Sequence, residues 1–256
     1  MDVIARRLIL FPCAGDILAG TLDEAAGTTG LLIVSGGNEV RGGAHRGMAL
    51  LAGRLAADGV PTFRYDRRGI GDSGGINRGY AGARDDLLAA AAVFRHAMPG
   101  IERIVGFGNC DAAAALALWG KDAELDSLVL ANPWLQEEAD DLPPVAAIAH
   151  RYRQRLLSIS GWRRLIDGNV DLRRVVMGLR KVFTRRAEPS DPSIAAAIAA
   201  WGERAAVLLA ARDATALAFA AQRVAVRTDI VDTDSHGFAR VADQAELYAA
   251  LRRALG

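Results

Sequence analysis

Cysteine is scarce in this chain of 256 residues, which contains only Cys13 and Cys110. Two cysteines exclude a disulfide framework and a four-cysteine zinc site, and a chain of this length needs neither for stability. Histidine is nearly as scarce, with four residues, so a mechanism that needs a histidine base has few candidates. The sequence contains no phosphate-binding glycine loop, dinucleotide fingerprint or clustered metal ligands, so we expect no cofactor and no metal.

Long apolar runs and an excess of one charge are also missing. No stretch approaches the roughly 18 consecutive apolar residues of a membrane-spanning helix, and the N-terminus lacks the features of a secretory signal. We therefore expect a cytoplasmic protein without a transmembrane segment. The 31 basic and 30 acidic side chains give a net charge of +1, which argues against a uniformly basic nucleic-acid-binding protein.

Short apolar runs and helical repeats alternate along most of the chain. Strands that alternate with helices predict an α/β fold with a mostly parallel sheet. Two runs that flank the turn residues Gly15 and Asp16 predict an antiparallel hairpin at the N-terminal edge of this sheet. The predicted strands are residues 7–12, 17–22, 31–34, 60–65, 101–107, 125–131, 205–211 and 226–231, and the predicted helices are 44–58, 81–97, 111–119, 193–203, 214–222 and 239–254.

The alternation stops after Pro133 and resumes near residue 193. Residues 135–190 contain several helical pieces and no convincing strand, which predicts a helical cap inserted into a core of residues 1–134 and 191–256. Between residues 151 and 186 the insertion has ten arginines and one lysine against two aspartates, a net charge of +9, whereas the rest carries −8. The sequence leaves open whether this segment faces an anionic or carrier-linked substrate, a membrane surface or only solvent.

The stretch Gly106-Phe107-Gly108-Asn109-Cys110-Asp111-Ala112 follows a predicted strand and opens a predicted helix. Small residues on both sides of a nucleophile are typical of a nucleophile elbow, because strand and helix approach closely at this tight turn. The turn would present Cys110 at the carboxyl edge of the sheet, where open α/β folds bind ligands. A buried cysteine is often only a small apolar side chain, so this pattern alone leaves both interpretations open.

An aspartate and a histidine follow Cys110 in the order nucleophile, acid, base. His236 lies in the loop after the last predicted strand, and Asp213 follows the strand at 205–211. Asp232 and Asp234 are alternative acids, but both adjoin the loop of the base itself. We therefore predict a triad in which Cys110 is the nucleophile, His236 is the base and Asp213 orients the base.

Two stretches of backbone are candidates for an oxyanion hole. Gly37 and Asn38 follow the strand at 31–34, and glycine there allows a backbone amide to turn toward a substrate oxygen. The amide of Asp111, at the start of the elbow helix, would be the other donor. The glycines alternatively form only a tight turn, and the Asp111 side chain either contacts a polar or cationic substrate group or is an ordinary first-turn acid.

These features together resemble the α/β-hydrolase superfamily over nearly the whole chain, and residues 66–73 are similar to a segment that such enzymes carry after the strand preceding the elbow. Three shorter segments, residues 36–46, 109–112 and 132–134, resemble the exosortase A system-associated hydrolase 1 family. That family is similar in having cysteine at the nucleophile position. The resemblance implies a link to exopolysaccharide production and exosortase protein sorting, and it implies no particular substrate.

The sequence therefore predicts a hydrolase of esters or thioesters that acts through an acyl-cysteine intermediate. The positive end of the elbow helix and an imidazolium on His236 would favour a thiolate on Cys110, whereas the adjacent Asp111 carboxylate would disfavour it. We expect a small-molecule acyl substrate, with Trp134 and His45 as candidates by position to contact it. Two alternatives stay open: an acyltransferase on the same triad, and a non-catalytic binding protein that retains the fold.

Overall fold

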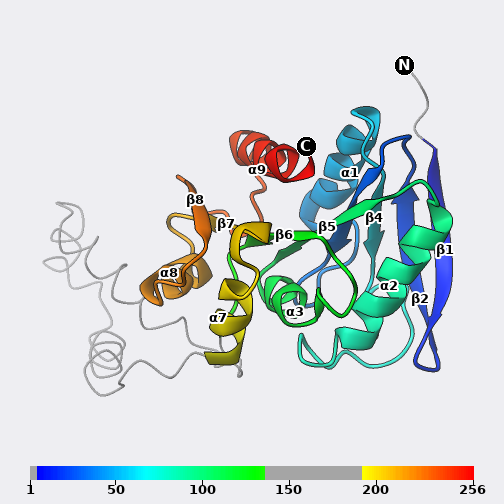
Figure 1. The fold of residues 1–256 in the computed structure, drawn as a ribbon, viewed down its shortest axis with the longest axis horizontal. Coiled ribbons are helices and arrows are strands. Elements are labelled where there is room, and N and C mark those ends of the chain that lie inside the picture. Colours follow the sequence, from blue (N-terminus) through cyan, green and yellow to red (C-terminus); the bar gives the residue numbers. More distant parts are fainter. Residues whose placement is uncertain (1–4, 136–191) are drawn as a thin grey trace, which may run out of the picture.

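The computed structural model describes residues 5–135 and 192–256, which form a mixed sheet with helices on both faces (Figure 1). The sheet has eight strands in the order β1-β2-β4-β3-β5-β6-β7-β8. The strands are β1 (Arg6–Cys13), β2 (Asp16–Asp23), β3 (Thr29–Val34), β4 (Thr62–Tyr65), β5 (Arg103–Asn109), β6 (Ser127–Ala131), β7 (Ala205–Ala210) and β8 (Arg227–Val231). The helices are η1 (Ala44–Arg46), α1 (Gly47–Ala57), α2 (Arg84–Ala97), α3 (Asp111–Trp119), α7 (Pro192–Ala199), η2 (Gly202–Arg204), α8 (Ala214–Ala221) and α9 (Val241–Leu255).

The sheet is parallel from β4 to β8 and antiparallel at its N-terminal edge, as predicted. β2 pairs antiparallel with both β1 and β4. The hairpin turn lies at Ala14 and Gly15, where φ is 50° and 92°, one residue earlier than the sequence pattern predicted. Positive φ at both central positions is typical of the tight turns that match the twist of paired strands. Asp16 is consequently the first residue of β2, opposite Cys13.

Alternate side chains of the parallel strands fill two apolar layers. Along β3, Leu32 and Val34 belong to the layer that also contains residues of α2, α3, α7 and α8, and Leu31 and Ile33 belong to the layer with α1 and α9. Figure 1 shows these two groups of helices on opposite faces of the sheet. Burial of both faces explains why the sequence of β3 is a continuous apolar run.

The parallel strands end at one edge of the sheet, and the predicted site residues lie in the loops at this edge. β6 and β7 are neighbours in the sheet, and residues 136–191 lie between β6 and α7 in the chain. The predicted helical cap and its basic segment therefore fall outside the described residues. In the described part of the chain, no helix is long and apolar enough to cross a membrane.

Candidate active site

Cys110 lies in a sharp turn between β5 and α3. Its backbone has φ 61° and ψ −124°, a conformation that L-residues rarely adopt. Three backbone hydrogen bonds hold the turn: the Cys110 amide donates to the Ala131 carbonyl (3.0 Å), and the Cys110 carbonyl accepts from the amides of Ala113 (3.1 Å) and Trp134 (3.2 Å). A Cβ on Gly108 would lie 2.9 Å from the backbone of Ala112, so the close approach of strand and helix requires glycine there. This geometry is typical of a nucleophile elbow.

The structure brings the three predicted triad residues together at the carboxyl edge of the sheet. Nδ1 of His236 lies 3.1 Å from Oδ1 of Asp213. The Cys110 thiol is the other neighbour of the imidazole and, as a hydrogen-bonding partner, raises the pKa of His236. The imidazole therefore lies between the carboxylate and the sulfur, which is the arrangement that a nucleophile, its base and an orienting acid require.

The two alternative acids have other partners. The Asp232 side chain is 87% exposed and pairs with Arg212, and Asp234 pairs with Arg240 at 2.5 Å. The Asp213 side chain is only 11% exposed. The geometry therefore favours Asp213 as the acid beside the imidazole.

The hydrogen bonds of His236 favour its charged form. The bond to Asp213, followed by the bond to Cys110, outweighs burial and raises the pKa of His236 to about 10. Burial is the largest influence on Asp213 and opposes its ionisation. The hydrogen bond and charge of His236 nevertheless combine with the amides of Thr215 and Ala216 to hold the pKa of Asp213 below its ordinary value. The site thus stabilises an imidazolium, the counter-ion that a thiolate needs.

Two asparagines hold the backbone of His236 in place. Nδ2 of the fully buried Asn132 donates to the His236 carbonyl (2.8 Å), and Nδ2 of Asn109 donates to the same oxygen (3.1 Å). Oδ1 of Asn132 accepts the amide of Ala210 at the end of β7 (2.8 Å). Their role was not apparent from the sequence, where the available signal is that Asn109 ends a strand and Asn132 directly follows one.

The same loop is also anchored to α9. The buried Thr233 donates from Oγ1 to Oδ2 of Asp243 (2.6 Å) and accepts the amide of Ser235 (3.1 Å). Asp243 is itself buried in the first turn of α9. His236 therefore lies on a loop that is fixed to the sheet on one side and to a helix on the other.

Asp111 connects the elbow to the loop after β3. Its Oδ1 accepts the Gly37 amide (2.5 Å), and its Oδ2 accepts from Nη2 of Arg67 (3.0 Å). The Gly37 amide, a predicted oxyanion donor, is therefore occupied by a carboxylate in this structure. Because the Asp111 carboxylate is already paired with a buried guanidinium, the geometry argues against its contacting a cationic substrate group. Arg67 was not apparent from the sequence as part of this site.

The two residues predicted to contact substrate lie in different surroundings. Trp134 is half-buried, and its amide bonds to the Cys110 carbonyl, so it lies at the elbow itself. His45 is exposed in η1, with a left-handed φ of 50°. The structure therefore places Trp134 next to the nucleophile turn and places His45 on the surface ahead of α1.

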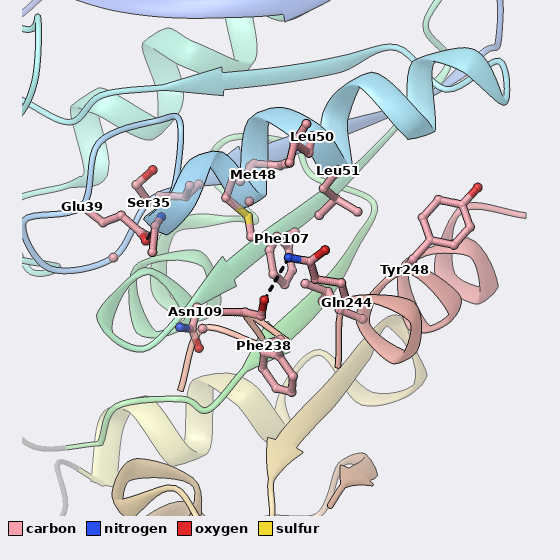
Figure 2. A pocket seen from close by; sticks show the side chains of 18 of the residues that line it. Ser35, Glu39, Met48, Leu50, Leu51, Phe107, Asn109, Phe238, Gln244 and Tyr248 are labelled. Carbon is pink, nitrogen blue, oxygen red and sulfur yellow. Dashed lines mark hydrogen bonds between the residues drawn. The ribbon is translucent and has the colours of Figure 1, made fainter. Parts of the chain in front are cut away.

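A cavity of about 120 Å³ lies behind the loops of the site (Figure 2). Met48 and Leu51 of α1, Phe107 of β5 and Phe238 provide much of its apolar surface. Backbone neighbours of the predicted site residues also line it, namely Gly36, Asn109 and Gly237. The cavity therefore adjoins the site from the side of α1 and α9.

Cys13 has a different environment from Cys110. It is buried, and burial, followed by the negative charge of Asp86, raises its pKa to about 11. Its Sγ lies 3.5 Å from Oδ1 of Asp86. Such a thiol stays protonated near neutral pH, which argues against a nucleophilic role for Cys13.

No protein-family model and no curated protein matches the sequence. Solved structures match over nearly the whole chain. The esterase Pf2001 from Pyrococcus furiosus is 15% identical, with a TM-score of 0.64 over 99% of this chain and 92% of that one. The alpha/beta hydrolase GrgF from Penicillium sp. sh18 is 16% identical, with a TM-score of 0.63 over 98% of this chain and 99% of that one.

A third match is XC6422 from Xanthomonas campestris, described as a member of the a/b serine hydrolases without a lid. It is 16% identical, with a TM-score of 0.58 over 97% of this chain and 93% of that one. At such low identity these similarities define the fold alone. The chain has the α/β-hydrolase fold, which confirms the predicted fold class. The narrower resemblance to exosortase A system-associated hydrolase 1 stays a prediction.

Proposed function

We propose that this protein hydrolyses an ester or thioester bond, with Cys110 as nucleophile, His236 as base and Asp213 as the acid that orients the base. The observation that carries this proposal is the connected set of carboxylate, imidazole and thiol at a strained strand–helix turn. The names of the similar structures, esterase and hydrolase, agree with this class of reaction.

In the proposed reaction, Sγ of Cys110 attacks the acyl carbon and forms a carbon–sulfur bond. The bond to the leaving group breaks as the His236 imidazolium gives its proton to the departing oxygen or sulfur. Water, which loses a proton to His236, then attacks the thioester, releases the acid and regenerates the thiolate. Asp213 faces Nδ1 of the imidazole, which leaves Nε2 for these proton transfers.

The charge next to Cys110 is compatible with this role. Asp111 follows the nucleophile, and an unpaired carboxylate there would oppose both the thiolate and a developing oxyanion. Its Oδ2 lies 3.0 Å from Nη2 of Arg67, whose side chain is only 2% exposed. This buried positive charge offsets the negative charge of the acid beside the nucleophile.

We further propose that residues 135–190 cap the site and that the core consists of residues 1–134 and 191–256. The chain leaves the core beside the nucleophile, because the Trp134 amide bonds to the Cys110 carbonyl and Leu135 is buried. A cap that begins there would meet the acyl group, and Trp134 would line its entrance. The net charge of +9 between residues 151 and 186 suits an anionic or carrier-linked substrate.

The three segments that resemble the exosortase A system-associated hydrolase 1 family come together at the proposed site. A Cβ on Gly36 would lie 2.4 Å from the Asn109 carbonyl oxygen, and Asn132 donates to Oδ1 of Asn109 (3.2 Å). From the resemblance of these segments, we propose that the activity serves exopolysaccharide production or exosortase sorting. Replacing the gene by one encoding Cys110→Ala should reduce secreted exopolysaccharide or alter the sorting of surface proteins. Unchanged levels of both would contradict this link.

The catalytic proposal is tested on a panel of p-nitrophenyl esters and acyl thioesters. We expect turnover by the wild type, and loss of roughly a thousandfold or more in Cys110→Ala, because the variant lacks the proposed nucleophile. Cys13→Ala is the matched control and should keep its activity. Iodoacetamide should label Cys110 and leave Cys13 unmodified. The rate of labelling should fall when substrate is present. Full activity of Cys110→Ala would exclude the mechanism. A wild type that shows neither turnover nor labelling of Cys110 would favour the non-catalytic alternative.

A further inference from the structure

Two charged side chains hold both polar backbone groups of Gly37. Nη2 of Arg67 donates to the Gly37 carbonyl (2.6 Å) and to Oδ2 of Asp111 (3.0 Å), and Oδ1 of Asp111 accepts the Gly37 amide (2.5 Å). Arg67 is 2% exposed, so this network lies against the protein interior. Gly37 has φ 54°, a left-handed conformation that glycine adopts without strain.

This network determines where the next amide points. The carbonyl of Gly37 and the amide of Asn38 belong to one trans peptide, in which they point in opposite directions. Because the carbonyl is directed toward the buried guanidinium, the Asn38 amide is directed away from it. Asn38 is exposed, and its backbone amide has no acceptor within residues 5–135 and 192–256. Its side chain is held aside, since Oδ1 accepts from Nδ2 of Asn77 (3.1 Å).

We propose that Arg67 and Asp111 are positioning residues that aim the Asn38 amide at the substrate oxygen, so that the oxyanion donors are the backbone amides of Asn38 and Asp111. This inference rests on the proposed function, because an oxyanion forms only if Cys110 attacks a carbonyl. In this arrangement Gly37 has a structural role, because its amide stays hydrogen-bonded to the Asp111 carboxylate throughout the reaction. Arg67 in addition keeps the charge of Asp111 from opposing the oxyanion.

A rival arrangement uses the same residues differently. In it, the Asp111 carboxylate releases the Gly37 amide, and that amide binds the substrate oxygen. Each turnover would then break a hydrogen bond to a charged acceptor, which is stronger than a neutral one. The two arrangements differ in one observable respect, namely which backbone amide changes its partner when an oxyanion occupies the site.

The first test needs no ligand. In amide proton NMR spectra, the Gly37 resonance should lie downfield in the wild type and move upfield in Asp111→Asn and in Arg67→Lys, because each change weakens the network. Asp111→Asn preserves the shape of the side chain, so this variant should fold, whereas Arg67→Lys preserves only the positive charge. Asp122→Asn, which removes a carboxylate from an exposed pair with Arg84, is the control and should leave the resonance in place. A Gly37 amide resonance with the same chemical shift in both variants as in the wild type overturns the inference.

The second test uses butyraldehyde as the probe. Sγ of Cys110 adds to the carbonyl carbon, the carbon–oxygen π bond breaks, and the oxygen takes the thiol proton or remains as the oxyanion. We expect the Asn38 amide resonance to move and the Gly37 resonance to stay. Movement of Gly37 with Asn38 unchanged would establish the rival arrangement. Absence of both ester turnover and Cys110 labelling in the wild type would overturn the proposed function, and with it any role of the network in catalysis.

Kinetics provide the third readout. Loss of one oxyanion donor lowers kcat by about 100-fold to 1,000-fold in comparable sites. We expect Asp111→Asn to lower kcat by about 10-fold or more with little change in KM, since the network acts on the transition state. Asp122→Asn should match the wild type. An Asp111→Asn variant that keeps its kcat would contradict the positioning role even if Cys110 proves to be the nucleophile.

Discussion

Oδ1 of Asp213 lies 3.1 Å from Nδ1 of His236, and the same oxygen accepts the amides of Thr215 and Ala216, both at 3.0 Å. One carboxylate oxygen therefore orients the imidazole and caps the first turn of α8. The extended backbone of Asp213, with φ −80° and ψ 142°, is usual for a helix N-cap. The cap fixes the carboxylate before any substrate arrives, which explains how the acid keeps its position at the end of a strand.

The two tasks of Asp213 can be separated by substitution. Asparagine retains an oxygen that can cap the helix but lacks the charge that stabilises an imidazolium, whereas alanine lacks both. We expect Asp213→Asn and Asp213→Ala to lower kcat by a similar factor of about 100 to 10,000. Asp213→Ala should lose about 1 kcal/mol more in the free energy of unfolding, measured by urea denaturation. Equal stability of the two variants would contradict the capping role.

The charge of His236 depends on Cys110 as well as on Asp213. Because the hydrogen bond with Cys110 is the second largest influence that raises the pKa of His236 to about 10, Cys110→Ala should lower that pKa. NMR titration of the imidazole Hε1 proton measures the change directly. Cys13→Ala is the control, and its His236 pKa should equal that of the wild type. The same His236 pKa in Cys110→Ala and the wild type would mean that the thiol and the imidazole do not interact.

The raised pKa of His236 also makes stability depend on pH. The folded state binds the imidazole proton more tightly than the unfolded state, whose pKa is near 6.5. This group therefore stabilises the fold fully below pH 6.5, and its contribution declines as pH rises toward about 10. We expect Asp213→Asn to flatten this decline, as measured by urea denaturation at several pH values. An unchanged slope between pH 6.5 and 10 would count against the interaction.

Most elements were predictable because each carries a local pattern. The parallel strands are short apolar runs, and the helices between them repeat apolar residues at helical spacing. The differences occur where backbone geometry overrides that pattern. The helix predicted from residue 44 begins as η1, since His45 and Arg46 have φ of 50° and 63°. The strand predicted from residue 60 begins at Thr62, after Pro61, which has no amide to donate to a neighbouring strand.

The candidate site was predictable only in part. Chain order and strand ends pointed to Cys110, Asp213 and His236, because each follows a recognisable strand. Asn132 acts on a carbonyl 104 positions away, and Arg67 acts on residues 30 and 44 positions away. Such contacts depend on how distant loops meet at the sheet edge, and no local spacing in the sequence encodes them. The occupied amide of Gly37 was unpredictable for the same reason.

Asn132 should matter for both stability and activity. It is fully buried, and Asn132→Ala would leave the Ala210 amide without its acceptor and the His236 carbonyl with one donor fewer. We expect a loss of about 2–4 kcal/mol in the free energy of unfolding and a lower kcat. Asn109→Ala is the matched variant and should cost less, because Asn132 still holds the carbonyl. A larger loss of unfolding free energy in Asn109→Ala than in Asn132→Ala would mean that Asn109, and not Asn132, is the more important of the two side-chain amides.

Gly36 marks the closest approach of the loop after β3 to the elbow. A Cβ there would lie 2.4 Å from the Asn109 carbonyl oxygen and 3.0 Å from Oδ1 of Asp111, so alanine would push the loop away from the nucleophile. We expect Gly36→Ala to lower kcat/KM by about 100-fold, the cost of a displacement of roughly 1 Å at a reacting centre.

Gly42→Ala is the control for this displacement, because a Cβ at Gly42 meets nothing within 4 Å and that glycine lies in the same loop. Its kcat/KM and melting temperature should equal those of the wild type. If Gly36→Ala melts like the wild type and keeps its activity, the loop can move without consequence, and the contact with the elbow would not set the catalytic geometry. If it loses activity while iodoacetamide still labels Cys110, the defect lies in the position of the loop rather than in the nucleophile.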